Sequence, residues 1–302
     1  MEKVAVLMCT YNGESWIEDQ IRSIAFQNNI KPYLYISDDG SQDNTYQQAI
    51  RACNEFEMSL HISENKSKYF KSRSAARNFY RIIIDTEIPK EYKWVAFSDQ
   101  DDIWNHSHLE RSIEILSQGK FNGYSSSVTA FWPNSKRIFI KKSGIINKLN
   151  YLFESAGPGC TYVLPRKIFD SMRSHFKENI DILDSLDFHD WSIYAYVSRY
   201  YSNWFIDDFS SLLYRQHSNN VLGSNNTLKG FLERVKLILG SWYRNQVLTL
   251  AKLVKLENNK IIYRYQRLNI FDRIILSIQV LKMRRKLMDK IMISLSTLIC
   301  KK

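Results

Sequence analysis

The first part of the chain alternates short apolar runs with segments whose apolar residues recur at helical spacing. Residues 4–8 form a continuous apolar run (VAVLM), which is typical of a strand buried on both faces of a parallel sheet. Residues 15–26 place their apolar side chains on one helical face. Strands are predicted next at residues 33–37 and 59–63, with a helix at residues 45–56 between them. This order predicts an α/β fold with a doubly wound, mostly parallel sheet.

The same alternation continues as far as residue 215. Further helices are expected at residues 72–85, 108–118 and 188–199. Further strands are expected at residues 94–98, 123–131, 136–140, 162–164, 204–206 and 211–215. The sequence shows no internal repeat and no low-complexity linker, so a single sheet-based domain is predicted over residues 1–227.

The positive charge of the chain is concentrated at its end. The 302 residues hold 42 Lys and Arg against 31 Asp and Glu, a formal net charge of +11. Residues 228–302 alone hold 17 Lys and Arg against 4 Asp and Glu, so the part before them is slightly acidic. A nucleic-acid binder with a uniformly basic surface would not show this asymmetry. We therefore predict a C-terminal basic helical extension over residues 228–302.

The last helix of this extension is predicted to be long and amphipathic. Its apolar residues recur at helical spacing from Ile274 to Ile299, and Lys and Arg residues crowd its middle around residues 282–290. Such a helix can lie on an anionic membrane surface. Packing as a helical subdomain or an oligomer contact is the equal alternative. A spanning helix is not expected, because the sequence has no uncharged apolar run of about 18 residues.

The four cysteines do not indicate a metal site or a disulfide framework. They are far apart in the sequence and show none of the short spacings of a zinc site. The chain begins directly with residues typical of a strand, so we expect no signal peptide. These observations predict a cytoplasmic protein, peripheral on the inner face of the cell membrane if the basic extension binds lipid.

An acidic cluster directly follows the predicted strand at residues 94–98. Asp99, Asp101 and Asp102 place three carboxylates within four residues, and like charges this close repel one another. A divalent cation that bridges to phosphate oxygens would relieve this repulsion, and Mn²⁺ or Mg²⁺ prefers such oxygen ligands. A solvated acidic loop or a helix N-cap is the alternative.

A second acidic motif ends the predicted strand at residues 33–37. Asp38 and Asp39 precede a glycine and a serine at the carboxyl end of that strand, where ligands bind in sheets of this type. A carboxylate there can accept hydrogen bonds from a nucleobase or a ribose, although an ordinary turn has the same residues. The sequence has no G-x-G-x-x-G motif and no Walker loop, which argues against NAD and P-loop ATP binding.

Five motifs of this sequence resemble family 2 glycosyltransferases, which are inverting enzymes of the GT-A fold. The same motifs occur there in the same order, and the closest resemblance is to bacterial rhamnosyltransferases. The resemblance covers about residues 3–225. The motifs are CTYNG at residues 9–13, DDGS at 38–41, SDQDDIW at 98–104, HDW at 189–191 and YRQH at 214–217.

The resemblance implies a nucleotide pocket formed by several of these residues. Thr10, Tyr11 and Glu14 would line the pocket, and Asp39 would face the base. Arg77 belongs to a segment that lies near the nucleotide in the family. The resemblance thus implies a donor in the form of a nucleotide sugar.

The resemblance also implies the metal site and the catalytic base. Asp99 and Asp101 match the family's D-x-D motif, in which Asp101 would bind the metal and Asp99 would bind the ribose or assist the metal. His217 stands where many GT-A enzymes place a residue on the metal or the diphosphate. Asp190 occupies the place of the general base. Judged from the residues alone, Asp190 could instead cap the predicted helix at residues 188–199, and His217 could be an ordinary loop histidine.

Three ring-bearing side chains are candidates for contact with the donor or acceptor sugar. They are Trp104, His189 and Trp191. Packing in the core is at least an equal alternative for the two tryptophans. His189 stands where many family members have glutamate, a departure that could reflect the choice of acceptor.

These candidates fit the chemistry of an inverting sugar transfer. One carboxylate takes the proton of the attacking hydroxyl, and a cation stabilises the departing diphosphate. A glycosidase would instead need a carboxylic acid to protonate the leaving oxygen. Together with this chemistry, the resemblance to bacterial rhamnosyltransferases and the basic extension imply a metal-dependent glycosyltransferase that moves rhamnose from dTDP-rhamnose to a lipid-linked cell-surface polysaccharide.

Two alternative functions stay open. An enzyme of the same fold could transfer another sugar from UDP-hexose or UDP-galactofuranose. A protein of another class could bind sugar nucleotides, or act as a membrane scaffold, without catalysis. For an enzyme, the expected partners are the nucleotide-sugar donor, the lipid-linked acceptor and an anionic membrane surface, and no nucleic acid. The sequence leaves a homo-oligomer open.

Overall fold

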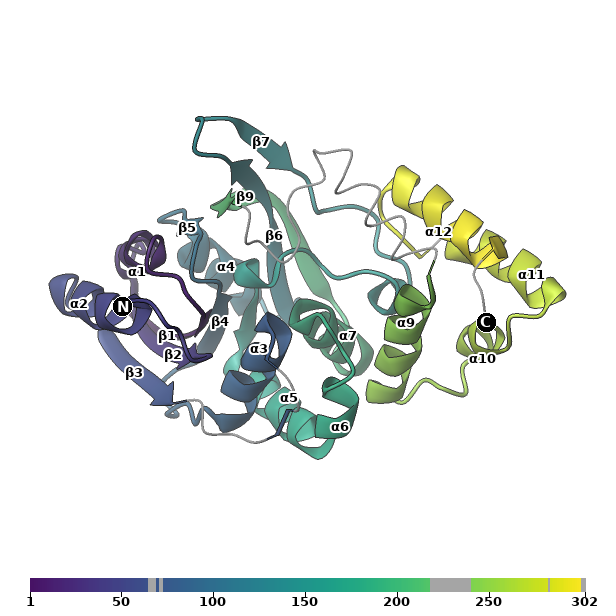
Figure 1. The fold of residues 1–302 in the computed structure, drawn as a ribbon, viewed down its shortest axis with the longest axis horizontal. Helices are drawn as coiled ribbons and strands as arrows, with labels where there is room; N and C mark the ends of the chain where they lie inside the picture. Colours follow the sequence, from purple (N-terminus) through teal and green to yellow (C-terminus); the bar gives the residue numbers. More distant parts are fainter. Residues whose placement is uncertain (65–68, 71–72, 218–239, 282, 300–302) are drawn as a thin grey trace.

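A central sheet with helices on both faces forms the body of the molecule, and a group of helices extends from one end (Figure 1). The computed structural model describes residues 1–64, 69–70, 73–217, 240–281 and 283–299. The predicted α/β architecture is confirmed, because parallel strands alternate with helices along the first 120 residues.

Within the described residues, nine strands join in one sheet. They are β1 (Glu2–Thr10), β2 (Ile30–Asp38), β3 (Ser59–Glu64), β4 (Trp94–Ser98), β5 (Ile103–Trp104), β6 (Gly123–Phe131), β7 (Arg137–Ile140), β8 (Val163–Pro165) and β9 (Trp204–Arg215).

The helices of the body flank these strands. They are α1 (Ile17–Ala25), α2 (Thr45–Glu55), α3 (Ala75–Asp85), α4 (His108–Ser117), α5 (Arg166–Glu178), α6 (Ile180–Leu183) and α7 (His189–Tyr200), with short 3₁₀ turns η1 (Asn150–Leu152) and η2 (Gly159–Thr161). The helices of the extension are α9 (Ser241–Leu253), α10 (Lys260–Arg267), α11 (Ile270–Val280) and α12 (Leu287–Ile299).

The strand order across the sheet is β3-β2-β1-β4-β8-β6-β9-β5, and β7 pairs with β6. β1 pairs in parallel with both β2 and β4, and β2 pairs in parallel with β3. Short antiparallel pairs then join β8 to β4 and to β6. The carboxyl ends of β1, β2 and β4 therefore lie at one edge of the sheet, which is the edge expected to bind ligands.

Apolar side chains form a separate core on each face of the sheet. Residues of α1, α2 and α4 pack on one face, and residues of α3, α5 and α7 pack on the other. The second core continues without a break into α9, whose Val247 and Leu250 are fully buried in the same cluster as Ile193 and Tyr194 of α7. The helical extension is thus packed onto the body by α9. The predicted domain boundary at residue 227 lies outside the described residues.

Two predictions of single elements need correction in the body. The strands expected at residues 204–206 and 211–215 are one strand, β9, whose register against β6 shifts near Ser126 and Ser127. The polar residues 207–210, which lie between the two apolar parts of β9, stay in the sheet through this irregular pairing with β6. α5 was not expected from the sequence, although Ile168, Phe169 and Met172 form a buried stripe along it.

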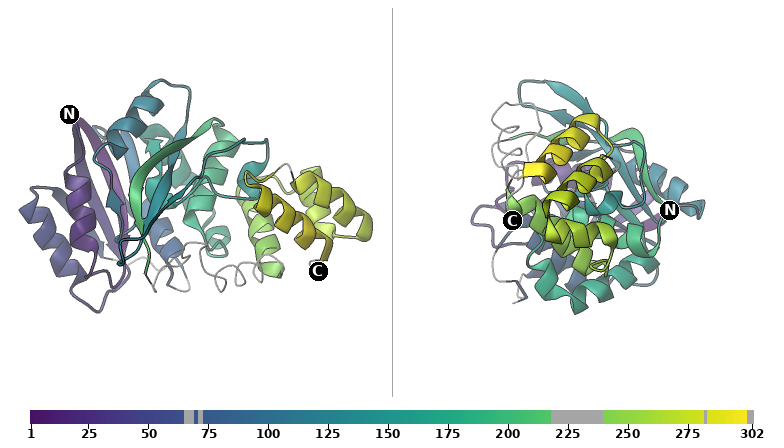
Figure 2. Two further views of the ribbon diagram at one scale, coloured as in Figure 1. Left: turned by 90° about the horizontal axis from the view of Figure 1, so that it is seen from above. Right: turned by 90° about the vertical axis from the view of Figure 1, so that its right-hand side faces the viewer.

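The prediction of one long last helix is wrong. The chain forms two helices, α11 and α12, which pack side by side at the far end of the extension (Figure 2). The segment that joins them carries Arg284 and Arg285, which bind acidic and carbonyl groups of the body instead of continuing the helix. Among the described residues, the structure contains no helix that is both long and apolar enough to span a bilayer.

Candidate active site

The predicted motifs meet where the parallel strands end. Thr10 of β1 lies opposite Asp38 of β2, and its hydroxyl donates a hydrogen bond of 2.8 Å to the Asp38 carboxylate. Asp99 follows Ser98, the last residue of β4 and the partner of Met8 in β1. The parallel pairing therefore brings the first three motifs to one edge of the sheet, as expected.

A pocket of about 270 Å³ opens beside Asp39. It lies between the ends of β2 and β3 and is lined by Asp38, Asp39, Gly40, Tyr46, Ile62, Ser63, Arg73 and Arg81. The Asp39 carboxylate pairs with the guanidinium of Arg81 at 2.7 Å. Burial raises the pKa of Asp39, while the positive charges of Arg81 and Arg73 oppose that rise. The pocket thus offers a carboxylate acceptor and guanidinium donors, as a nucleobase and ribose would require.

The loops around this pocket are held by hydrogen bonds within the site. The Gln100 side chain accepts from the backbone N–H of Tyr11 and donates to its carbonyl, both at 2.9 Å. Gly13 makes this clamp possible, because a Cβ there would come within 2.3 Å of the Gln100 amide. Glu14 accepts hydrogen bonds from Asn44 at the start of α2. Tyr11 and Glu14 thus lie near the pocket, and their contacts to a nucleotide stay predictions.

Two arginines line the pocket, Arg73 and Arg81, and Arg81 lies one helical turn after the predicted Arg77. Arg77 points instead toward the segment that follows α6, where its Nε donates to the Asp184 carboxylate at 2.8 Å. Its nucleotide contact stays a prediction. A spacing of four residues on α3 places Arg77 and Arg81 on one helical face, and this spacing is the signal that could have identified Arg81.

The SDQDDIW motif at residues 98–104 contacts the YRQH motif at residues 214–217 because β5 pairs with β9. This antiparallel pair brings Asp101 next to His217, whose Nε2 lies 2.8 Å from an Asp101 carboxylate oxygen. The Arg215 side chain donates to the Asp101 carbonyl at 2.8 Å and so fixes the loop. The His217 ring is stacked on Trp16, with ring centroids 4.1 Å apart. The two side chains predicted to share a metal are therefore in direct contact.

The other two carboxylates of the motif lie deeper. Ligand atoms of Asp99, Asp102 and Cys160 all come within 4.8 Å of one another. Burial raises the pKa values of both carboxyl groups, and the charge of Asp101 raises them further. A group of acidic oxygens with mutual repulsion is a donor set that fits Mg²⁺ or Mn²⁺. Asp99 and Asp101, with His217 beside them, are the residues that could hold such an ion, whereas Asp102 is fully buried and accepts from the Arg215 backbone.

Asp190 lies in the first turn of α7. Its carboxylate accepts the backbone N–H of Trp191 at 2.8 Å. Burial raises the pKa of Asp190 to about 6, although hydrogen bonds from Trp191 and the Ser155 hydroxyl and the charge of Lys142 oppose the rise. A carboxylate with a pKa just below neutral is ionised at neutral pH and still basic enough to take a proton.

Asp190 and Asp39 both lie near Asp99. Asp190 packs against Gly159, and the thiol of the next residue, Cys160, is within 4.8 Å of an Asp99 oxygen. After burial and the charge of Asp101, the charge of Asp190 raises the pKa of Asp99. In β1, burial and then the charges of Asp99 and Asp39 raise the pKa of the Cys9 thiol.

The predicted sugar contacts of two tryptophans are wrong. Trp104 is 1% exposed and packs edge-on against His108 inside the core. Trp191 is 6% exposed, donates to the Tyr151 carbonyl at 2.9 Å and stacks on Tyr243. Neither ring presents a free face to a sugar, because neighbouring side chains of the core cover the large apolar surface of each ring.

His189 is close to Asp190 but has a packing role. Its ring is stacked on Phe79, with centroids 3.7 Å apart, and burial lowers its pKa to about 3, so it is neutral. The Nε2 atom has no hydrogen-bond partner among the described residues. It lies against Gly159, where a Cβ would come within 2.4 Å of it. Its contact with an acceptor stays a prediction.

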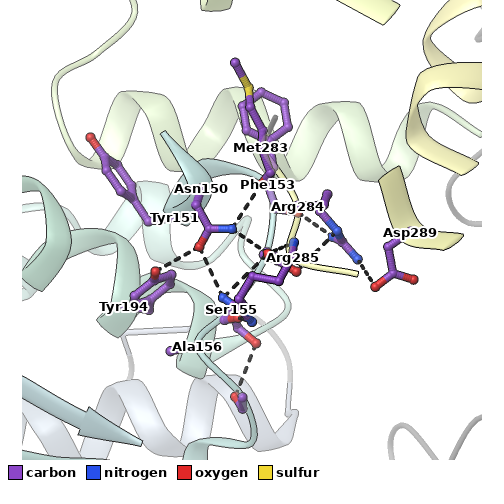
Figure 3. Close-up of polar contacts among 12 residues, drawn as sticks. Asn150, Tyr151, Phe153, Ser155, Ala156, Tyr194, Met283, Arg284, Arg285 and Asp289 are labelled. Carbon is purple, nitrogen blue, oxygen red and sulfur yellow. Dashed lines mark hydrogen bonds and ion pairs between the residues drawn. The ribbon is translucent and has the colours of Figure 1, made fainter. Parts of the chain in front are cut away.

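A polar network anchors the loop that carries Ser155 (Figure 3). The Arg285 guanidinium donates to the Asn150 side chain at 3.2 Å and to the Ser155 carbonyl. Glu154 accepts the backbone N–H of Arg285 at 2.7 Å and pairs with both Arg284 and Arg285. The segment between α11 and α12 thus holds the loop whose serine contacts Asp190, a connection that the sequence motifs did not indicate.

Replacing Glu154 by glutamine should lower the free energy of unfolding by about 3–5 kcal/mol. The variant keeps the shape of the side chain but leaves the largely buried Arg285 without its carboxylate and leaves Arg284 with Asp289 alone. Urea unfolding would measure the loss. The control is Glu87→Gln, which removes an exposed partner of Arg173 and should cost at most about 1 kcal/mol. Equal stability of the two variants would contradict the role given to Glu154.

Comparisons with known proteins agree with this arrangement. Residues 5–170 match the family described as Glycosyl transferase family 2. The chain is 35% identical over 295 residues to the dTDP-rhamnosyl transferase RfbG of Shigella flexneri, covering 95% of this chain and 98% of that protein. It is 28% identical over 182 residues to the UDP-Glc:alpha-D-GlcNAc-diphosphoundecaprenol beta-1,3-glucosyltransferase WfgD of Escherichia coli, covering 59% of this chain and 66% of that protein.

A solved structure shares the fold. S. aureus TarS 1-349 in complex with UDP-GlcNAc superposes with a TM-score of 0.54 at 14% sequence identity, covering 93% of this chain and 80% of that chain. At this identity, the likeness concerns the arrangement of strands and helices alone.

Proposed function

Since this chain belongs to the family 2 glycosyltransferases and has their GT-A fold, we propose that it transfers rhamnose from dTDP-rhamnose to a lipid-linked saccharide. The observation that supports the proposal most is the closeness of Asp39 and Asp190 to Asp99 at the carboxyl edge of the sheet. We infer that the nucleotide pocket, the cation site and the base adjoin one another there.

Asp190 is the base in the proposed reaction. Its carboxylate takes the proton from an acceptor hydroxyl as the oxygen of that hydroxyl bonds to the anomeric carbon. The bond from this carbon to the diphosphate breaks on the opposite side, so the configuration inverts. The hydrogen bonds from Trp191 and Ser155 hold the carboxylate in place and favour its ionised form. The chain thereby supplies the one proton acceptor that a single displacement needs.

Asp99 and Asp101 would hold a divalent cation, with His217 beside them. A bound Mn²⁺ or Mg²⁺ supplies positive charge to the departing diphosphate. Arg215 keeps the acidic loop in position through the Asp101 carbonyl, and Trp16 supports the His217 ring. On the nucleotide side, Asp39 and Arg81 would orient the base and ribose.

The transfer rate should depend on the ionisation of Asp190. Below about pH 6 the carboxyl group is protonated, so kcat/KM should fall about tenfold per pH unit, whereas above this pH it should level off. Ser155→Ala removes a hydrogen bond that lowers the pKa of Asp190. The inflection in the pH profile of kcat/KM should therefore lie at a higher pH for this variant than for the wild type. Initial rates from pH 5 to pH 8 would give the profiles of both proteins. A rate that stays level down to pH 5 would contradict the assignment.

The identity of the donor can be tested with a panel of nucleotide sugars. The proposal of dTDP-rhamnose is supported by the Shigella flexneri relative, whose likeness extends over nearly the whole chain. The panel would compare dTDP-rhamnose, UDP-glucose and UDP-galactofuranose for thermal stabilisation and for donor turnover with Mn²⁺. Stabilisation and turnover with dTDP-rhamnose above the others support the proposal, and preference for a UDP-sugar would overturn it.

A UDP-hexose donor is the second candidate, and the Escherichia coli relative favours it over a shorter part of the chain. The printed name of that relative also contains a diphosphoundecaprenol acceptor, which supports a lipid-linked acceptor for this chain. Reaction on the inner face of the cell membrane would follow from such an acceptor. Donor binding without turnover on any lipid-linked acceptor would favour a non-catalytic protein instead.

A further inference from the structure

The two last helices present their apolar sides to solvent. Phe271 and Ile278 of α11 are 74% and 62% exposed, and Leu287 and Leu295 of α12 are 69% and 56% exposed. Other large apolar residues of both helices are exposed on the same sides. We call these exposed apolar side chains of α11 and α12 the hairpin face. Exposed apolar stripes on two helices that pack together mark an interaction site.

The buried sides of the same helices combine apolar and hydroxyl residues. Leu276 of α11 and Ile293 of α12 are fully buried in the core, and the Ser294 hydroxyl donates to the Ser277 carbonyl at 2.8 Å. A helix at the surface of a soluble domain normally turns its only apolar stripe inward. Here each helix has a second apolar stripe that faces outward, and small hydroxyl residues help to join the two helices. Contacts through small and hydroxyl residues are typical of helices packed in lipid.

The charge around the hairpin face favours an anionic lipid surface over a second copy of the chain. Residues 269–302 contain eight Lys and Arg against two Asp and Glu. Arg284 and Arg285 are bound to the body, whereas Lys286 is exposed at the start of α12. Each lysine near an anionic bilayer adds about 1 kcal/mol of attraction. A second copy of the chain would bring more net positive charge to this face, whereas an anionic bilayer brings the opposite charge.

We propose that the hairpin face inserts into the headgroup region of a bilayer that contains anionic lipids. Two helices of 11 and 13 residues lie in the interface and do not cross it. The segment between them holds the loop of Ser155, so the face has a fixed place relative to Asp190. Membrane binding by the hairpin face does not depend on the proposed function. Only its purpose does, which is to bring a lipid-linked acceptor to the active site.

The first experiment measures lipid binding and needs no transfer reaction. The full chain is sedimented with vesicles of phosphatidylethanolamine and phosphatidylglycerol, and Ile278→Glu/Leu295→Glu is compared with the wild type. The double variant should bind at least about ten-fold more weakly, because each buried Leu or Ile contributes about 1.5–3 kcal/mol. The control is Ile50→Glu, which replaces an exposed apolar residue of α2, a helix at the opposite end of the molecule (Figure 1), and should bind like the wild type.

Two further measurements make the test decisive. Lys286→Glu/Lys290→Glu should weaken binding to anionic vesicles and leave the already weaker binding to phosphatidylcholine vesicles unchanged. All variants should retain the nucleotide-dependent thermal shift, because their side chains lie outside the site. Equal vesicle binding by Ile278→Glu/Leu295→Glu and the wild type would overturn the proposal. So would a wild-type dimer without vesicle binding that becomes monomeric in this variant. Failure of rhamnose transfer alone would bear on the proposed function and not on the hairpin face.

Discussion

Replacing Asp190 by asparagine should slow sugar transfer by roughly 10²–10⁴-fold, the usual contribution of a positioned general base. The amide cannot take a proton from the acceptor hydroxyl, although it keeps an oxygen that can accept the N–H of Trp191. Donor binding should be unchanged, because Asp190 faces the acceptor side in the proposed reaction. Turnover with a lipid-linked acceptor would give the rate, and calorimetric titration with dTDP in the presence of Mn²⁺ would give the donor affinity.

The matched control is Asp181→Asn, which changes an exposed carboxylate of α6 in the same part of the chain. It should transfer at the wild-type rate. Wild-type transfer by Asp190→Asn would show that another group accepts the proton, and the single-displacement mechanism through Asp190 would have to be abandoned.

Replacing Asp101 by asparagine should reduce transfer by at least about 100-fold and abolish the effect of Mn²⁺ on nucleotide binding. A cation contributes several kcal/mol to the stabilisation of the leaving group, and each 1.4 kcal/mol is about a factor of ten in rate. Removal of metal from the wild type with a chelator should have an effect of the same size. Thermal shift by dTDP with and without Mn²⁺ provides a measurement that is independent of activity.

Asp99→Asn offers a second measurement at the same cluster. Burial and the charge of Asp101 raise the pKa of Asp99 to about 7, so the metal-free protein loses stability as the pH rises from about 4, where the unfolded chain ionises, and the loss is complete above about pH 7. Asp99→Asn should therefore unfold at a higher temperature than the wild type in chelator at neutral pH, and Mn²⁺ should narrow this difference. Asp19→Asn, an exposed partner of Arg215, is the control and should leave the Mn²⁺ effect in place. A wild-type Mn²⁺ response in Asp101→Asn and Asp99→Asn would exclude the proposed cation site.

The sequence predicted the sheet well because its strands are specified locally. The apolar run of β1 is fully buried from Val4 to Met8, as its pattern required. The motif residues after β1, β2 and β4 come together because the strands are parallel, and parallel pairing follows from the alternation of strands and helices. The family resemblance assigned Asp101 and His217 to one metal site, and the pairing of β5 with β9 is what brings the two side chains into contact.

The roles of individual side chains were less predictable. Trp104 and Trp191 stand within motifs, but burial inside the core decides that neither is free for a sugar. The choice of Arg81 over Arg77 at the pocket depends on the segment after α6, which draws Arg77 away through Asp184. Such choices are made by partners that are distant in the sequence, and the local pattern contains no information about them.

The sequence by itself determined the succession of strands and helices, the acidic motifs at the strand ends and the basic character of the extension. These features depend on the residue types within a few turns or one strand, where backbone preferences and hydrophobic periodicity act. The tertiary structure alone decided which way the apolar stripes of α11 and α12 face. A helical period defines a stripe, but only the surroundings of the helix determine whether that stripe lies in the core or on the surface. In α11 and α12 the packing buries Leu276 and Ile293 in the core and leaves a second apolar stripe on the surface.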